Sequence, residues 1–200
     1  MCTFLGTAGS ALNELNRPHG LARDPTTGTL YIAEYNNNRV MRYLSGATSG
    51  TIIAGGNGAG LGSTQLSGPI GITFDTTTNS ILIANNNAHN VLRWVIGASS
   101  WTLVAGSSSG TSGSTSNLLC NPTYVKLDSM SNMYIADRCN HRIVYIVYGQ
   151  TTYTTIAGTT GVSGSTASLL NLPSSAAIDS QFNIYVADNS NNRIQRFIHY

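Results

Sequence analysis

The hydrophobic positions of this chain fall in short runs of about five residues, separated by Gly, Asn, Asp, Ser and Pro. Runs of this length that are rich in Ile, Val, Tyr and Thr are typical of β-strands, and the residues between them are typical of turns. No stretch has the apolar periodicity of an amphipathic helix of useful length. The pattern therefore predicts an all-β protein.

The strands belong to a repeat of about fifty residues. Four segments align, and they begin at Asn16, Ser67, Cys120 and Asn171. A proline and an aspartate mark each copy at steps of 51, 53 and 51 residues: Pro18, Pro69, Pro122 and Pro173, and Asp24, Asp75, Asp128 and Asp179.

Each copy predicts four short strands. The first follows the proline, as in residues 71–75, and the second covers residues 30–34, 81–85, 133–137 and 184–188. The third covers 39–43, 90–94, 142–146 and 193–197, and the fourth precedes a Gly/Ser-rich loop, as in 51–55. A four-strand unit at this period is typical of a β-propeller blade, and propellers close with about four to eight blades.

We expect a single domain over residues 1–200, with repeats at about 15–65, 66–117, 118–168 and 169–200. The last repeat stops after its third strand, whereas residues 2–9 are similar to a fourth strand and its following loop. The N-terminal strand could therefore complete the last blade and close a four-blade ring. The alternative is that the chain is part of a longer propeller.

One motif recurs through the repeats: P-x-G-[IL]-x-x-D, then [LI]-Y-[IV]-A-[DEN]-x-x-N-x-R-[IV]. It resembles the NHL repeat, in four copies that cover nearly the whole chain. The second copy departs most, with Asn85 and Asn90 in place of the acid and the Arg, and the fourth has Ser174-Ser175 where a Gly is usual. The resemblance implies a propeller but no single activity, because NHL propellers serve as interaction modules, RNA binders and a lyase.

Charge is scarce in this chain and carries little information about partners. Ten Lys plus Arg stand against eight Asp plus Glu, which gives a formal net charge of +2. This balance provides no basic stripe for nucleic acid. No apolar stretch approaches the 18 or more residues of a membrane span, and the N-terminus lacks the pattern of a signal peptide.

Three cysteines are too few for a disulfide scaffold, and their spacing fits no common zinc pattern. Cys120 precedes the first strand of the third repeat, and Cys139 lies in the loop after its second strand. Because neighbouring strands are antiparallel, both fall on one face of one blade, so we expect a Cys120–Cys139 disulfide. Such a bridge favours an oxidising, extracellular location, and without it the compartment stays open.

An acid and an arginine stand at the two ends of the tight loop between the second and third strands. Because the pair recurs, we interpret it as a structural clamp that holds the turn, not as a catalytic pair. Its members are Glu34 and Arg39, Asp137 and Arg142, and Asp188 and Arg193.

The residue after each repeat proline should open the first strand near the central channel. These residues are His19, Ile70, Thr123 and Ser174, and one His among three poor ligands predicts no metal site and no cofactor. The chain also lacks G-x-S-x-G, H-E-x-x-H and Walker motifs. We therefore expect no enzyme activity.

The sequence favours a non-catalytic binding scaffold whose loop face contacts a protein or another macromolecule. We expect this face to hold polar residues that vary between blades: Tyr35, Asn36, Asn87, His89, Arg138, His141, Asn189 and Asn191. Two alternatives remain, a lyase- or lactonase-like propeller enzyme by fold analogy and an RNA-binding regulator. Glu34, Asp137 and Asp188 should share the face with its arginines, which argues against RNA. The oligomeric state stays open.

Overall fold

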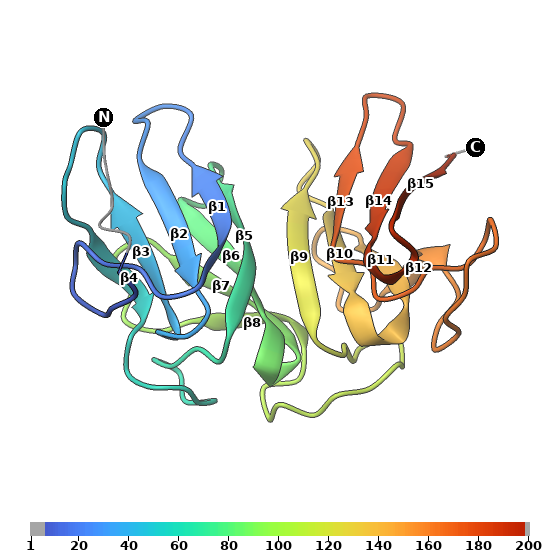
Figure 1. Ribbon diagram of the computed structural model, residues 1–200, viewed down its shortest axis with the longest axis horizontal. Coiled ribbons are helices and arrows are strands. Elements are labelled where there is room, and N and C mark those ends of the chain that lie inside the picture. The colour runs from blue at the N-terminus through green and yellow to red at the C-terminus, as the bar shows by residue number, and fades with distance from the viewer. Residues whose placement is uncertain (1–6, 199–200) are drawn as a thin grey trace.

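A computed structural model describes residues 7–198 and shows four antiparallel sheets arranged as a four-blade β-propeller. The all-β propeller architecture expected from the sequence is confirmed. Figure 1 shows the first two sheets on the left and the last two on the right, with β5 and β9 near the middle.

The strands of the four blades follow the repeat. Blade 1 contains β1 (Pro18–Arg23), β2 (Leu30–Glu34), β3 (Arg39–Tyr43) and β4 (Thr51–Gly55). Blade 2 contains β5 (Pro69–Asp75), β6 (Ser80–Asn85), β7 (Asn90–Val95) and β8 (Thr102–Gly106). Blade 3 contains β9 (Pro122–Leu127), β10 (Met133–Asp137), β11 (Arg142–Ile146) and β12 (Thr154–Gly158). Blade 4 contains β13 (Ser175–Ile178), β14 (Ile184–Asp188) and β15 (Arg193–Phe197).

Short 3₁₀ turns join the second and third strands of blades 2 to 4: η1 (Asn86–Ala88), η2 (Arg138–Asn140) and η3 (Asn189–Asn191). The repeated aspartate shapes the opposite turn, between the first and second strands, because its carboxylate accepts backbone N–H groups there. In blade 3, Asp128 Oδ1 accepts from the N–H groups of Met130 and Asn132, each at 2.9 Å. Among residues 7–198, no helix has the length and apolar character that a membrane crossing requires.

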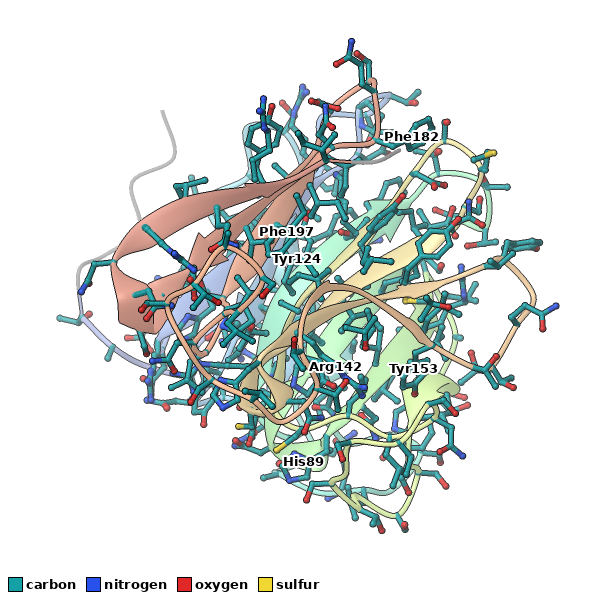
Figure 2. All side chains as sticks on the ribbon, turned by 90° about the vertical axis from the view of Figure 1, so that its right-hand side faces the viewer. His89, Tyr124, Arg142, Tyr153, Phe182 and Phe197 are labelled. Atoms are coloured by element: carbon teal, nitrogen blue, oxygen red, sulfur yellow. The ribbon has the colours of Figure 1, made fainter. Side chains whose placement is uncertain are left out.

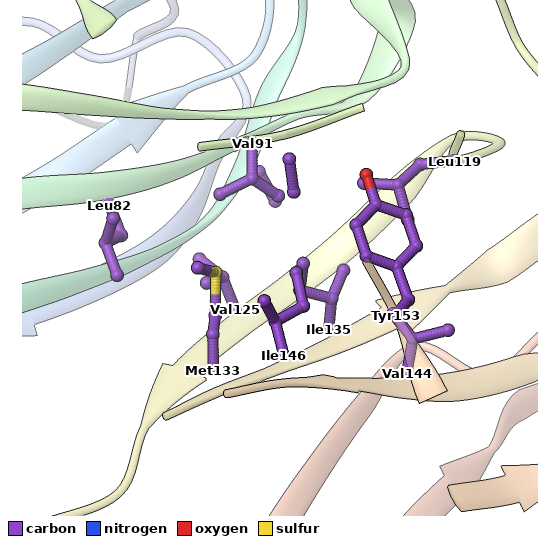
Figure 3. Packing of buried hydrophobic residues seen from close by; sticks show 11 residues of the cluster. Leu82, Val91, Leu119, Val125, Met133, Ile135, Val144, Ile146 and Tyr153 are labelled. Carbon is purple, nitrogen blue, oxygen red and sulfur yellow. The ribbon is translucent and has the colours of Figure 1, made fainter. Parts of the chain in front are cut away.

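The hydrophobic core lies between successive blades and not within any one of them. Alternate residues of each strand face the preceding blade and the following blade, because side chains alternate across a sheet. Figure 3 shows the layer between blades 2 and 3, where Leu82 and Val91 of blade 2 pack against Val125 and Ile135 of blade 3. A leucine from each connecting loop seals these layers, and Leu66, Leu119 and Leu170 are fully buried.

The first strands of neighbouring blades, β1, β5, β9 and β13, contact one another in that order. Glycine permits this close approach at Gly71, where an added Cβ would lie 2.6 Å from the carbonyl oxygen of Thr123. Of the N-terminal strand expected at residues 2–9, only residues 7–9 are described. They belong to the loop before blade 1, where the Gly9 N–H donates to the Leu15 carbonyl. The rest of that predicted strand lies outside the described residues.

Candidate functional site on the loop face

The predicted clamp is built in the same way in three blades. In blade 3, the buried carboxylate of Asp137 accepts from Arg142 Nε at 2.8 Å, from Asn140 Nδ2 at 2.8 Å and from the backbone N–H of Cys120 at 2.7 Å. Arg142 also donates to the carbonyl of Leu118 at 3.2 Å. One ion pair therefore joins the turn, the strand that follows it and the loop that leads into the blade.

The other blades repeat or replace this arrangement. The Arg39 Nε–Glu34 Oε1 distance is 2.8 Å, and the Arg193 Nε–Asp188 Oδ2 distance is 2.7 Å. Blade 2 uses a neutral version, in which Asn85 Nδ2 donates to Asn90 Oδ1 at 3.1 Å. These contacts within and around the turns give the recurring acid and arginine residues a structural role.

The side chains of the clamp acids are 0 % exposed. The expectation that they temper the positive charge of the loop face is wrong, because each carboxylate is buried and neutralised by an arginine. Arg39 of the blade 1 clamp is buried as well. The exposed charge of the face must come from other residues.

Two of the predicted face residues join neighbouring blades. His89 Nδ1 accepts the backbone N–H of Asn121 at 3.1 Å, and His141 Nδ1 accepts that of Leu172 at 3.1 Å. In blade 1 the side chain of Asn38 does the same for Gly68 at 2.9 Å. His141 therefore links blade 3 to blade 4.

The hydrogen bond between blades depends on a left-handed backbone conformation at the accepting residue, which the strand pattern of the sequence does not indicate. Asn38, His89 and His141 all have positive φ, between 49° and 56°. Non-glycine residues adopt this region rarely, and Asn and His are among those that do so most often. The Asn/His alternation at this repeat position is the signal that could have revealed it.

A hollow of about 610 Å³ opens on the loop face, where the first strands of the four blades converge. The four residues after the repeat prolines all line it, as their expected position near the channel requires. Its lining is Arg17, His19, Gly20, Tyr35, Ile70, Gly71, Asn86, Thr123, Tyr124, Arg138, Ser174, Ser175 and Asn189.

A compact polar cluster stands at the blade 1 side of the hollow. The guanidinium carbon of Arg17 lies 4.6 Å from the centre of the Tyr35 ring, a cation–π geometry. His19 meets the same ring edge-on at 5.7 Å between ring centres, and the Tyr35 hydroxyl donates to Asn87 Oδ1 at 3.1 Å. Partial burial, and then the charge of Arg17, lower the pKa of His19, so its imidazole is neutral at neutral pH.

No Asp or Glu lines this hollow, whereas two arginines do. Neither Arg17 nor Arg138 forms an ion pair with any residue between 7 and 198. No three His, Cys, Asp or Glu side chains in that part of the chain gather closely enough to hold a metal ion. The arrangement suits recognition of a negatively charged group.

The residues predicted for the binding face thus separate into groups. Tyr35, Arg138 and Asn189 line the hollow, and Asn87 holds the Tyr35 hydroxyl. Asn191 is taken up by the clamp, since its Nδ2 donates to Asp188 Oδ2 and to the Gly164 carbonyl. Asn36 is exposed and donates to Asn16 Oδ1 at 2.9 Å. Sequence reasoning missed Arg17, although it is the only basic residue among the four that precede a repeat proline.

Cys120 and Cys139 lie together, as expected for two positions on one face of one blade. The backbone N–H of Cys139 donates to the Cys120 carbonyl at 3.1 Å, and both thiols contact Asn121 Oδ1, at 3.8 Å from Cys120 and 3.1 Å from Cys139. Both are free thiols in this structure, so the disulfide stays a prediction. Burial and the neighbouring Cys139 raise the pKa of Cys120 to about 12. Cys2 lies outside the described residues.

A second hollow, of about 350 Å³, lies between blades 3 and 4, and Phe182 and Phe197 are among its lining residues. Figure 2 shows Phe182 at the end of the molecule opposite His89, so the turn that carries it belongs to the other face. The lining is mostly apolar side chains with a single carboxylate, Asp128. Its chemistry differs from that of the loop-face hollow, whose lining holds two arginines and no carboxylate.

Comparison with known families finds the NHL repeat at residues 15–43 and 170–197. Two segments of the chain thus match the NHL repeat, and the chain folds as a four-blade β-propeller. The two matches cover parts of the first and last blades, and the blades between them repeat the same four-strand unit. No curated protein matches the sequence significantly.

Several solved structures share the fold of this propeller. A structural genomics protein of unknown function from Bacteroides thetaiotaomicron superposes with a TM-score of 0.74 at 17% identity, over 92% of this chain and 47% of that one. An auxiliary nutrient binding protein from the same species gives 0.68 at 21% identity, over 88% and 46%. A streptogramin B lyase gives 0.59 at 13% identity, over 92% and 52%. The chain thus spans about half the length of these proteins, and the likeness shows the fold alone.

Proposed function

We propose that this propeller is a non-catalytic binding module whose loop-face hollow holds an acidic group of a partner protein. The observation that carries the proposal is the pair Arg17 and Arg138, which line the hollow without a carboxylate among its other lining residues. The three clamp acids in the neighbouring loops are buried, and each is paired with the arginine of its own clamp.

The two arginines are prepared for such a role by their surroundings. The Tyr35 ring stacks against the Arg17 guanidinium and limits its motion without neutralising its charge. Arg138 belongs to η2, the short turn between β10 and β11, whose ends are fixed by the Asp137–Arg142 clamp. A preorganised guanidinium loses less entropy on binding a carboxylate.

We propose a non-catalytic role because the side chains that line the hollow do not form a catalytic set. His19 is the only imidazole there, and no acid or thiol in the lining could activate it. The Nδ1 atoms of His89 and His141 accept backbone N–H groups of the next blade, so these two imidazoles have a structural role. The nutrient-binding and lyase neighbours have this fold but no shared identity above 21%.

A protein partner fits the charge of the chain better than a nucleic acid does. Nucleic-acid affinity comes largely from many Lys and Arg contacts to phosphates, and it rises with the number of phosphates neutralised. The chain has ten Lys plus Arg in total, and within residues 7–198 four of them form ion pairs. Two accessible arginines in one hollow suit one or two carboxylates and not a phosphate backbone.

The test is fluorescence anisotropy with a labelled oligoglutamate peptide at low and physiological salt. We expect binding that Arg17→Gln and Arg138→Gln each weaken at least about tenfold, since a hydrogen bond to a charged group contributes about 1.5–3 kcal/mol. Arg23→Gln is the matched control, because Arg23 is exposed at the far end of β1 and loses the same charge. Equal effects of all three substitutions, or preference for a labelled RNA homopolymer, would contradict the proposal.

A further inference from the structure

The walls of the loop-face hollow come from the same repeat positions in every blade. The first residue of each turn between the second and third strands lines it: Tyr35, Asn86, Arg138 and Asn189. The residue that follows each repeat proline lines it as well: His19, Ile70, Thr123 and Ser174. The fold therefore brings these side chains to one hollow, and their differences between blades decide what the hollow can bind.

The hollow holds two positive charges that its own lining does not balance. Arg17 and Arg138 line it without a carboxylate, and neither has an ion-pair partner within residues 7–198. One aspartate or glutamate side chain of a partner brings a single negative charge, which leaves one of the two arginines uncompensated. A phosphomonoester brings a charge of about −1.5 to −2 at neutral pH on one group, close to that of two carboxylates. The charge of the hollow therefore matches one phosphomonoester better than one carboxylate.

The hydrogen-bond donors of the hollow come from three different blades. Arg17 precedes β1 of blade 1, Arg138 opens η2 of blade 3, and Asn189 opens η3 of blade 4. No hydrogen bond within residues 7–198 occupies the side-chain donors of these three residues.

This distribution of donors distinguishes between two kinds of acidic group. A carboxylate presents two oxygens in one plane, and the fork of a single guanidinium can satisfy both of them. A phosphomonoester presents three acceptor oxygens that point in different directions from the phosphorus, so donors from several blades can each reach one. Donors from blades 1, 3 and 4 therefore suit the phosphoryl group.

We infer that the loop-face hollow binds a phosphomonoester on a side chain of the partner protein, as in phosphoserine or phosphothreonine. The inference rests on the proposed function, because it specifies the acidic group that the hollow holds. Arg17 and Arg138 donate to the phosphoryl oxygens from blades 1 and 3, and the Asn189 amide donates from blade 4. Phosphorylation of the partner then controls whether it binds.

Fluorescence anisotropy with three labelled peptides tests the inference. The peptides share one neutral sequence and differ at a central residue, which is serine, glutamate or phosphoserine. We expect the phosphoserine peptide to bind at least about tenfold more tightly than the glutamate peptide, because it accepts a further charge-assisted hydrogen bond. The serine peptide should not bind.

Variants of the hollow assign the preference to its donors. Arg17→Gln and Arg138→Gln should each lower the affinity for the phosphoserine peptide at least about tenfold, since each removes a charged donor. Asn189→Ala should lower it about fivefold and leave the affinity for the glutamate peptide within about twofold, because a neutral donor contributes less. Arg23→Gln is the control of equal charge, because Arg23 is exposed at the far end of β1 and does not line the hollow. Circular dichroism checks that every variant keeps its β structure.

The outcomes separate this inference from the proposed function. Equal affinities for the phosphoserine and glutamate peptides would overturn the inference and leave the proposed function in place. Binding of neither peptide would contradict both. Tighter binding to phosphoinositide-containing vesicles than to the phosphoserine peptide would place the phosphomonoester on a lipid and overturn the inference.

Discussion

Replacing one member of a clamp should cost far more stability than replacing the whole clamp by the version that blade 2 already uses. Asp137→Asn removes the charge that neutralises Arg142, whose side chain is only 4% exposed. Breaking a buried ion pair by removing one partner costs about 3–5 kcal/mol, because the remaining charge stays buried. We expect a loss of unfolding free energy in that range.

The matched variant carries Asp137→Asn, Asn140→Ala and Arg142→Asn together and reproduces the set Asn85, Ala88 and Asn90 of blade 2. In blade 2, the Asn85 side chain still accepts the N–H of the residue leading into β5 at 2.6 Å, and Asn90 Nδ2 donates to the Ser107 carbonyl at 2.8 Å. No buried charge remains, so the loss should be about 1–2 kcal/mol, comparable to one or two hydrogen bonds.

Urea unfolding followed by tryptophan fluorescence and by circular dichroism measures both losses. Additive behaviour would refute the reasoning: if the triple variant lost as much as the sum of its single variants, the clamp would not act as a unit. A loss below about 1 kcal/mol for Asp137→Asn alone would show that the buried pair contributes little.

Three further outcomes follow from the geometry. Burial lowers the pKa of His89, and burial together with the charge of Arg138 lowers the pKa of His141. As the pH falls, these two histidines therefore take up protons in the unfolded chain before they do so in the folded chain. The stability should be full above about pH 6.5 and fall as the pH drops through the folded pKa values. A thermal-unfolding series across pH 5–8 checks this, and His89→Asn with His141→Asn should flatten the dependence while keeping the inter-blade bonds. Gly71→Ala should lower the melting temperature by several degrees, because its Cβ meets backbone 2.6 Å away. Oxidation should join Cys120 to Cys139 and raise stability by about 3 kcal/mol, as a loop of this length allows, and non-reducing peptide mapping identifies the bridge.

The repeat made the fold predictable because every copy carries the same signals. The second strands begin and end within one residue of the expected bounds, as at Leu30–Glu34 and Ile184–Asp188. The recurrence of Asp137 with Arg142 pointed to a structural pair, since a fold-specifying contact recurs wherever the fold does. The second and third strands of blade 4 also match their expected bounds, whereas the strand expected at residues 2–9 lies mostly outside the described residues.

The candidate site was only partly predictable from the sequence. Tyr35, Arg138 and Asn189 were expected on the loop face and line the hollow, but Arg17 was overlooked. The charge of the face was misjudged because exposure decides which charges act on a ligand, and a sequence does not show that Asp137 is buried. The contact between His141 and Leu172 joins two blades through a left-handed backbone position, which no strand pattern encodes.

We propose that the loop-face hollow is where this propeller binds its partner. Amide chemical-shift mapping during titration with an oligoglutamate peptide tests it most directly. We expect shifts concentrated on residues of the hollow, such as Gly20, Gly71 and Thr123, and their loss in the Arg17→Gln, Arg138→Gln double variant. Shifts clustered instead around Phe182 on the opposite face, or unchanged in that variant, would contradict it.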